Sequence, residues 1–292
     1  MPKIAYEDKK FTAATMEIIT QAEQIIELYQ GQGFFLTLRQ LYYQFVARAL
    51  IENTERAYKK MGNIISDARR TGLIDWDSIE DRTRYIRQNS FWSGPHDIIE
   101  TARDSYHRDL WANQDCRIEV WIEKDALVGV IEGKCRELDV PFFSCRGYVS
   151  DSEMWRAAMR IDRFTGTGQR VTILHLGDHD PSGIDMTRDI QDRLDLFALK
   201  TPAEVNRIAL TMDQIEEVNP PPNPAKVTDS RFEGYRARYG EESWELDALE
   251  PRYIVDLIEE HIFAERDIDR WQEAVEEQEQ DRKQIQDMLD QL

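Results

Sequence analysis

The stretch VTILHLGDHDPSGIDM, residues Val171 to Met186, decides the fold class of this chain. A strand-like apolar run ends abruptly in Asp178 and Asp180, and a Pro-Ser-Gly turn then opens a helix-like segment. Side chains two residues apart on an extended chain point to the same side, so both carboxylates can face one point. Like charges this close repel each other, which leads us to expect a cation at the end of this strand.

Strand-like and helix-like segments alternate from residue 117 onward. The strand-like segments span residues 117–123, 140–147, 170–176 and 204–211, and the helix-like segments between them span 124–138, 152–164 and 184–197. This alternation predicts an α/β fold with a mostly parallel sheet and helices on both faces. Glu123 ends the first of these strands, so it faces the same point as the two aspartates if the two strands are neighbours.

The three carboxylates predict a metal site. Glu123, Asp178 and Asp180 offer hard oxygen ligands without a histidine or cysteine pair, which suits Mg²⁺ or Mn²⁺ better than zinc. Magnesium at such a cluster usually bridges to phosphate. Gly183 leaves room for a close approach, and the helix that follows offers backbone N–H groups to an anion. The alternative is structural, because aspartate also caps helices and tolerates turns.

The N-terminal part has a different pattern. Residues 11–29 read as an amphipathic helix, and residues 37–86 read as helix, turn, basic helix and a short extended return, the layout of a winged helix-turn-helix. We expect Thr54 to cap the basic helix. The basic side chains on or near it suit contacts with DNA phosphates: Arg56, Lys59, Lys60, Arg69 and Arg70. A solvated helix face is the alternative.

Composition sets the limits on these readings. The 292 residues carry a net charge of −19, but residues 241–292 alone hold 18 acidic and 5 basic side chains, whereas residues 36–70 hold 7 basic and 3 acidic ones. Net charge describes solubility, while nucleic-acid binding depends on a local patch. Cys116, Cys135 and Cys145 form no close ligand pair, which is typical of reduced thiols. With no apolar stretch of membrane-span length and no signal sequence, we expect a cytoplasmic, nucleoid-associated protein of bacterial, plasmid or phage type.

Several motifs resemble one known family. IEKDAL (122–127), RGYVSD (146–151) and GDHDPSG (177–183) resemble the Toprim motifs of the topoisomerase VI A subunit, whose family includes the meiotic double-strand-break protein. LRQLYY (38–43) resembles the tyrosine motif in that family's winged-helix domain, and ELDAL (245–249) is similar to its C-terminal part. The resemblance implies a DNA-binding domain over residues 1–90, a linking helix over 91–115, a Toprim domain over 116–265 and an acidic helical tail over 266–292.

The resemblance also implies roles for matched positions. Tyr43 would attack a DNA phosphodiester and become linked to the 5′ end, Tyr42 would pack, and Arg39 would steady the phosphate or the phenolate. Glu123, together with both aspartates, would hold Mg²⁺ or Mn²⁺ and also move a proton. Lys124 and Arg146 would contact DNA.

The implied assembly is a homodimer in which the tyrosine of one subunit works with the Toprim domain of the other. The chain shows no ATPase module, so strand passage would need a separate B-type subunit, and a stand-alone A-like protein fits better. Two alternatives stay open. One is a hydrolytic Toprim endonuclease or nickase, in which water attacks and Tyr43 merely packs. The other is a winged-helix regulator that binds DNA and never cuts it.

Overall fold

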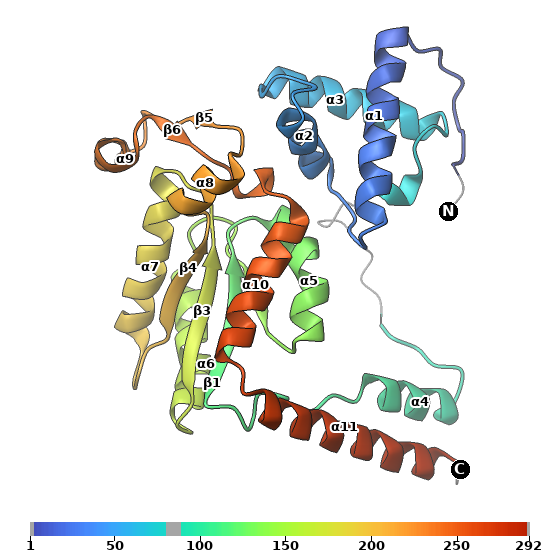
Figure 1. Cartoon of the computed structure of the whole chain (residues 1–292). Coiled ribbons are helices and arrows are strands. Elements are labelled where there is room, and N and C mark those ends of the chain that lie inside the picture. The colour runs from blue at the N-terminus through green and yellow to red at the C-terminus, as the bar shows by residue number, and fades with distance from the viewer. Residues whose placement is uncertain (1–2, 80–88, 291–292) are drawn as a thin grey trace.

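The computed structural model describes residues 3–79 and 89–290. A group of N-terminal helices lies beside a larger α/β unit (Figure 1). The N-terminal elements are α1 (Ala13–Gln30), α2 (Leu38–Ala47), α3 (Glu55–Arg70) and the 3₁₀ helix η1 (Trp76–Ser78), and α4 (Pro95–Ser105) follows. The α/β unit contains β1 (Cys116–Ile122), η2 (Asp125–Leu127), α5 (Val128–Glu137), β2 (Phe142–Ser144), α6 (Asp151–Thr165), β3 (Arg170–Leu176), α7 (Pro181–Phe197), β4 (Glu204–Ala209), α8 (Met212–Val218), β5 (Asn223–Pro224), α9 (Phe232–Tyr239), β6 (Glu242–Ser243), η3 (Leu246–Ala248), α10 (Pro251–Glu265) and α11 (Ile268–Leu289).

The N-terminal helices begin at side chains that satisfy free backbone N–H groups. Thr54 accepts a hydrogen bond from Ala57 N, which confirms the predicted cap of α3. Thr37 and Gln40 form a reciprocal capping box at the start of α2. After α3, Ile79 makes a single bridge to Leu36, and the rest of the expected extended return, residues 80–86, lies outside the described residues.

These helices enclose an apolar cluster of their own. Its fully buried members come from all three helices and from the adjoining loops: Ile19, Tyr29, Leu36, Leu41, Phe45, Ile65 and Ile74. Ala248 of η3 belongs to the same cluster, so the segment between β6 and α10 packs against α2.

The sheet confirms the predicted α/β class. Its four strands are all parallel, in the order β2-β1-β3-β4, so β1 and β3 are neighbours as the carboxylate argument required. The register pairs Ile122 with Leu176, which places Glu123 beside Gly177 at the carboxyl edge. Helices α5 and α10 cover one face and α6 and α7 cover the other, each with its own apolar cluster.

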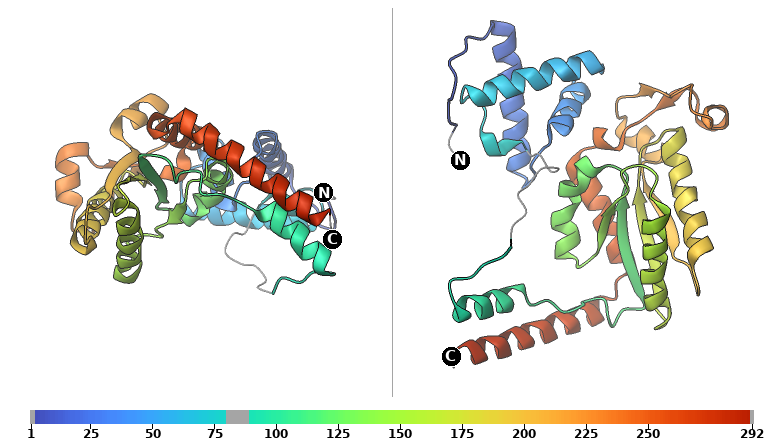
Figure 2. Two further views of the ribbon diagram at one scale, coloured as in Figure 1. Left: turned by 90° about the horizontal axis from the view of Figure 1, so that it is seen from below. Right: turned by 180° about the vertical axis from the view of Figure 1, so that it is seen from behind.

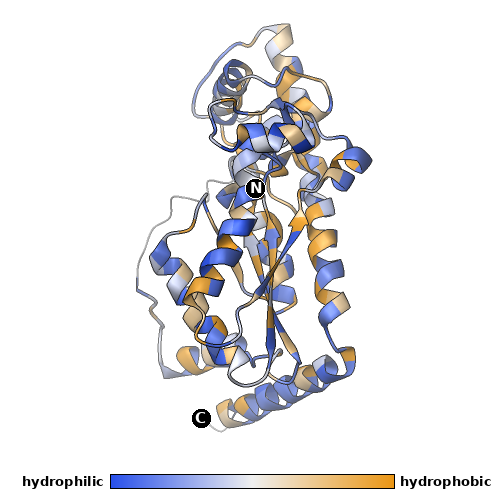
Figure 3. Ribbon diagram, turned by 90° about the vertical axis from the view of Figure 1, so that its left-hand side faces the viewer, coloured by the Kyte–Doolittle hydropathy of each residue, from blue (hydrophilic) through white to orange (hydrophobic). Residues whose placement is uncertain are grey.

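Two further features lie outside the sheet. The β5–β6 hairpin and α9 lie over its carboxyl edge, near the start of α7 (Figure 1). Helix α4, the linking helix expected over residues 91–115, spans only Pro95–Ser105 and lies alongside α11, and the pair extends away from the sheet (Figure 2). Helix α11 is mostly hydrophilic (Figure 3), with Trp271 and Ala274 among its few buried residues. Across residues 3–79 and 89–290, no helix combines the length and apolarity needed to cross a membrane.

Candidate active site

The loop after β3 brings Glu123 against the backbone of the aspartate motif. The Asp178 N–H donates a hydrogen bond to Glu123 Oε2 over 2.9 Å. Two glycines lie close to the Glu123 carboxylate, and at Gly183 the neighbouring backbone leaves no room for a Cβ. A Cβ added to Gly183 would lie 2.2 Å from the Asp178 carbonyl oxygen and 3.2 Å from Glu123 Oε2, and one added to Gly177 would lie 2.9 Å from Glu123 Oε2. The two glycines therefore form a cradle: without side chains of their own, they leave room for the Glu123 carboxylate against the backbone.

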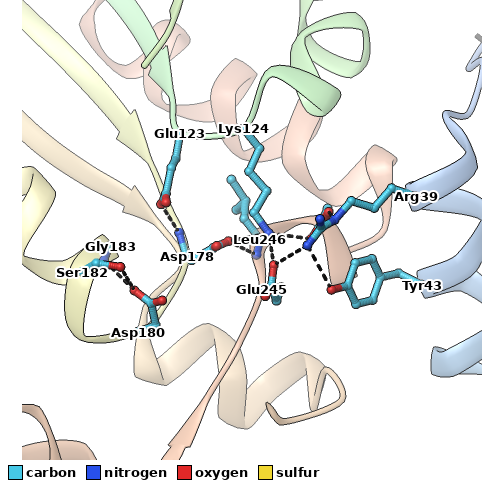
Figure 4. Close-up of polar contacts among 12 residues, drawn as sticks. Arg39, Tyr43, Glu123, Lys124, Asp178, Asp180, Ser182, Gly183, Glu245 and Leu246 are labelled. Carbon is cyan, nitrogen blue, oxygen red and sulfur yellow. Dashed lines mark hydrogen bonds and ion pairs between the residues drawn. The ribbon is translucent and has the colours of Figure 1, made fainter. Parts of the chain in front are cut away.

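The two aspartates have different backbone donors. Asp178 Oδ1 accepts a hydrogen bond from Leu246 N over 2.7 Å, whereas Asp180 caps α7, its Oδ1 accepting from Gly183 N over 2.6 Å. The expectation that both carboxylates aim at one point is therefore not met, because each is fixed by a separate N–H group (Figure 4). In the described part of the chain, no three His, Cys, Asp or Glu side chains lie close enough together to hold an ion. The capping alternative is confirmed for Asp180.

Each of the three carboxylates nevertheless keeps one oxygen free. Among the described residues, Glu123 Oε1, Asp178 Oδ2 and Asp180 Oδ2 take part in no hydrogen bond or ion pair. Burial raises the pKa of Asp178 to about 8, with Glu123 and other carboxylates adding to the shift and Lys124 opposing it. Burial likewise raises the pKa of Glu123, while the hydrogen bond from Asp178 N opposes that shift. The edge thus holds hard oxygen donors that are short of positive charge.

Lys124 lies among carboxylates rather than on the surface. Its Nζ is 3.0 Å from Asp178 Oδ1 and 2.8 Å from Asp247 Oδ1, and it also pairs with Glu245. These carboxylates raise the pKa of the Lys124 ammonium against the effect of burial. The expectation that Lys124 contacts DNA is corrected here: with its side chain only 14% exposed and three acidic partners, it is not available to a phosphate in this structure.

Arg39 links the carboxylates around Lys124 to helix α2, which carries Tyr43. Its Nε donates to Asp247 Oδ2 over 3.0 Å and its Nη2 to Glu245 Oε2 over 3.2 Å. The same Nη2 lies 3.5 Å from the Tyr43 hydroxyl, as the spacing of four along α2 predicts (Figure 4). A chain of polar contacts therefore runs from Tyr43 through Arg39 and the 245–247 segment to Lys124 and Asp178.

Tyr43 is buried, and its surroundings favour the neutral phenol. Its side chain is 5% exposed, and burial raises its pKa to about 12, with Asp247 and Glu245 adding to the shift. The hydroxyl lies at a pocket of about 270 Å³ between α2, the start of α3 and Asn223. Tyr42, expected to pack, is also buried and donates its hydroxyl to Asn53 Oδ1 over 3.1 Å.

Sequence reasoning gave no role to Arg207, a charged residue in the middle of β4. Its buried guanidinium donates to backbone carbonyls at three points of the aspartate motif, Gly177, Asp178 and Gly183, at 2.9, 2.6 and 2.9 Å. It also reaches Leu210 O and Thr187 Oγ1. Burial lowers its pKa to about 10, and the nearby carboxylates oppose that shift. An arginine in the middle of a short strand of the parallel sheet was the signal that could have revealed this role.

The residues expected to contact DNA differ in their surroundings. Arg56, Lys59 and Lys60 are exposed on α3, with Lys59 paired to Glu55. Arg69 instead packs over the Trp76 ring and donates to its carbonyl oxygen, so its role here is structural. Two more are exposed beside an acidic partner: Arg70 next to Glu7 and Arg146 next to Asp125.

No protein-family model matches this chain, and no curated protein matches it either.

Proposed function

We propose that this chain is a DNA-binding and DNA-cleaving protein similar to the topoisomerase VI A subunit, with a winged-helix domain over residues 1–90 and a Toprim domain over 116–265. The observation that carries the proposal is the continuous polar network from Tyr43 through Arg39 to Lys124 and Asp178. A phenol, a guanidinium and an acidic strand edge, drawn from segments 200 residues apart, have no need to meet for packing alone.

The residues at the strand edge supply the donor type that a divalent cation takes, but holding an ion would require the three carboxylates to come closer together than they lie in this structure. The free oxygens of Glu123, Asp178 and Asp180 are the ligand type that Mg²⁺ or Mn²⁺ prefers, and the glycine cradle at residues 177 and 183 keeps the backbone close to them. Glu123, Asp178 and Asp180 would hold the ion. Bound there, it would supply charge stabilisation at the oxygens of a scissile phosphate.

The covalent step follows from the chemistry of Tyr43. Its oxygen forms a bond to phosphorus while the bond from phosphorus to the 3′ oxygen breaks, which leaves a 5′-phosphotyrosyl link and a free 3′-hydroxyl. The phenolic proton must leave and the 3′ oxygen must gain one. With a pKa of about 12 the phenol needs help. Arg39, whose Nη2 lies 3.5 Å from the hydroxyl, would stabilise the phenolate. The proposal gives the proton to Glu123, which in this structure contacts Asp178 N and not Tyr43, so the tyrosine would have to approach the carboxylate edge first.

Duplex DNA would bind along the exposed basic side chains of α3, since Arg56 and Lys60 are free to meet phosphates. The proposed assembly is a homodimer, and ATP-driven strand passage would require a separate B-type subunit. In this structure Arg39 contacts the acidic 245–247 segment of its own chain, and Tyr43 lies beside Arg39. A dimer in which Tyr43 works with the partner's Toprim domain would require Arg39 and Tyr43 to leave this segment and meet the partner's.

One observation favours hydrolysis as a second candidate. Tyr43 is buried and its high pKa opposes ionisation. The same carboxylates could direct a water molecule at phosphate instead, and Tyr43 would then only pack.

A single experiment separates these candidates. Supercoiled plasmid is incubated with wild type, Tyr43→Phe and Asp178→Asn in Mg²⁺, Mn²⁺ or EDTA, and the products are run with and without protease digestion. The proposal expects cut DNA that enters the gel only after proteolysis, lost in both variants and in EDTA. Free DNA ends from Tyr43→Phe would establish the hydrolytic nuclease, and binding without any cutting by wild type would establish a regulator.

A further inference from the structure

A second pocket lies on the other side of the aspartate motif from Tyr43. It has a volume of about 490 Å³ and is lined by the first turns of α7 and by α9 with the residues just before it. Figure 1 shows where these two helices lie. Pro181, which directly follows Asp180, is part of its wall. A strand of nucleic acid with a phosphate at Asp180 would therefore lie near this pocket.

The charged side chains of the pocket are mainly basic. Arg188, Arg231 and Arg238 line it, against a single acidic residue, Asp185. Two of the arginines are already paired: Arg188 and Arg231 donate to Asp185 over 2.8 and 2.9 Å, Arg188 also pairs with Asp192, and Arg231 also pairs with Asp229. Arg238 is exposed and has no hydrogen-bond or ion-pair partner within residues 3–79 and 89–290. Arg238 is therefore the lining arginine whose charge is left for an anion.

The remaining wall is apolar and aromatic. Pro181, Ile184 and Tyr239 contribute to it. The Tyr239 ring packs against His179 in a T-shaped arrangement, with centroids 4.7 Å apart, and its centroid lies 5.1 Å from that of the buried Tyr235 ring. A half-exposed aromatic ring fixed in this way offers a stacking face to a base.

We propose that this pocket binds one unpaired nucleotide of a DNA strand, with the phosphate on Arg238 and the base against Tyr239. The inference rests on the proposed function, because the DNA is the one cut at the neighbouring carboxylates. The volume falls within the range of pockets that hold small ligands, which a base with its sugar and phosphate fits. An acidic peptide would use the arginines but would leave the aromatic wall without a partner of matching shape.

The test compares two DNA probes by fluorescence anisotropy in EDTA, where the proposal predicts binding without cutting. One is a blunt duplex, and the other is the same duplex with a three-nucleotide unpaired tail. We expect wild type to bind the tailed probe about tenfold more tightly, since stacking of one base has an effect of this order. Arg238→Ala and Tyr239→Leu should each remove most of that difference and leave blunt-duplex binding nearly unchanged.

Arg236→Ala is the matched control. Arg236 lies on the same helix, but it pairs with Glu241 at 2.8 Å and is not part of the pocket. Its variant should keep the tenfold preference. The pocket assignment would be overturned if wild type bound both probes with equal affinity, or if Arg236→Ala and Arg238→Ala lost the preference for the tailed probe equally. Either result would leave the proposed DNA binding intact. Failure of wild type to bind either probe would overturn the proposed function as well. Arg236 and Arg238 are exposed and Tyr239 is partly buried, and thermal unfolding of all three α9 variants reports whether they fold.

Discussion

Replacing Lys124 by methionine tests the charge network that links the two halves of the site. The ammonium of Lys124 is the cation shared by Asp178, Asp247 and Glu245, and the Asp247 side chain is fully buried. Removing one partner of a buried ion pair typically costs about 3–5 kcal/mol, because the remaining charge is left uncompensated. Arg39 still contacts Asp247 at 3.0 Å, so we expect a loss near the lower end of this range, about 3 kcal/mol.

The matched control is Lys134→Met. Lys134 is similarly covered, with its side chain 17% exposed, but its partners Glu137 and Glu259 are 62% and 24% exposed. Pairs of this kind contribute about 0–1 kcal/mol. Urea unfolding followed by circular dichroism measures both variants against wild type. If Lys124→Met is no less stable than Lys134→Met, Lys124 does not hold Asp178, Glu245 and Asp247 together, and the polar contacts from Tyr43 to Asp178 do not stabilise the fold.

Three further outcomes follow from the same edge of the sheet. Gly183→Ala should unfold or distort the site, because its Cβ would lie 2.2 Å from a carbonyl oxygen, whereas Gly133→Ala in α5, with nothing within 4 Å, should leave stability equal or raise it by up to about 1 kcal/mol in thermal unfolding. Arg207→Lys should destabilise the chain by about 2 kcal/mol and speed amide exchange over residues 177–183, because a lysine cannot satisfy all the carbonyls the guanidinium contacts; Arg170→Lys, at an exposed site, should not. Burial lowers the pKa of His175 to about 3, so the side chain stays neutral in the folded protein but gains a proton below about pH 6.5 in the unfolded one. The free energy of unfolding of the wild type should therefore fall as the pH drops from 6.5 towards 3, by up to about 1.4 kcal/mol per pH unit more than that of His175→Gln. Unfolding free energies at pH 7, 6 and 5 measure this difference.

The sequence was sufficient for the sheet because its signals are local and repeated. Alternating apolar strands and amphipathic helices predicted the parallel sheet, and chain order with neighbouring strands then placed Glu123 beside the aspartate motif. The cap at Thr54 was equally local, since a threonine before a helix needs only its own next turn.

The polar partners could not be predicted in the same way. Whether Asp178 and Asp180 converge depends on which backbone N–H each one meets, and the donor for Asp178 is Leu246, which lies 68 residues further along the chain. Lys124 looked like a surface cation from its position in a motif, but the acidic 245–247 segment folds back over it. Arg207 supports the motif from a neighbouring strand, and no spacing rule connects the two segments.

The same contacts constrain how Tyr43 could act. In this structure its pKa is raised by burial and by Asp247 and Glu245, while Arg39 and Lys124 oppose that shift. A DNA phosphate entering beside Tyr43 would bring further negative charge, which disfavours the phenolate even more. Arg39 can offset this only if its guanidinium leaves Asp247 and Glu245, which it contacts at 3.0 and 3.2 Å, and turns to the phosphate. DNA and the acidic segment therefore compete for one arginine, so under the proposed function the ion pairs seen here belong to the resting state of the protein.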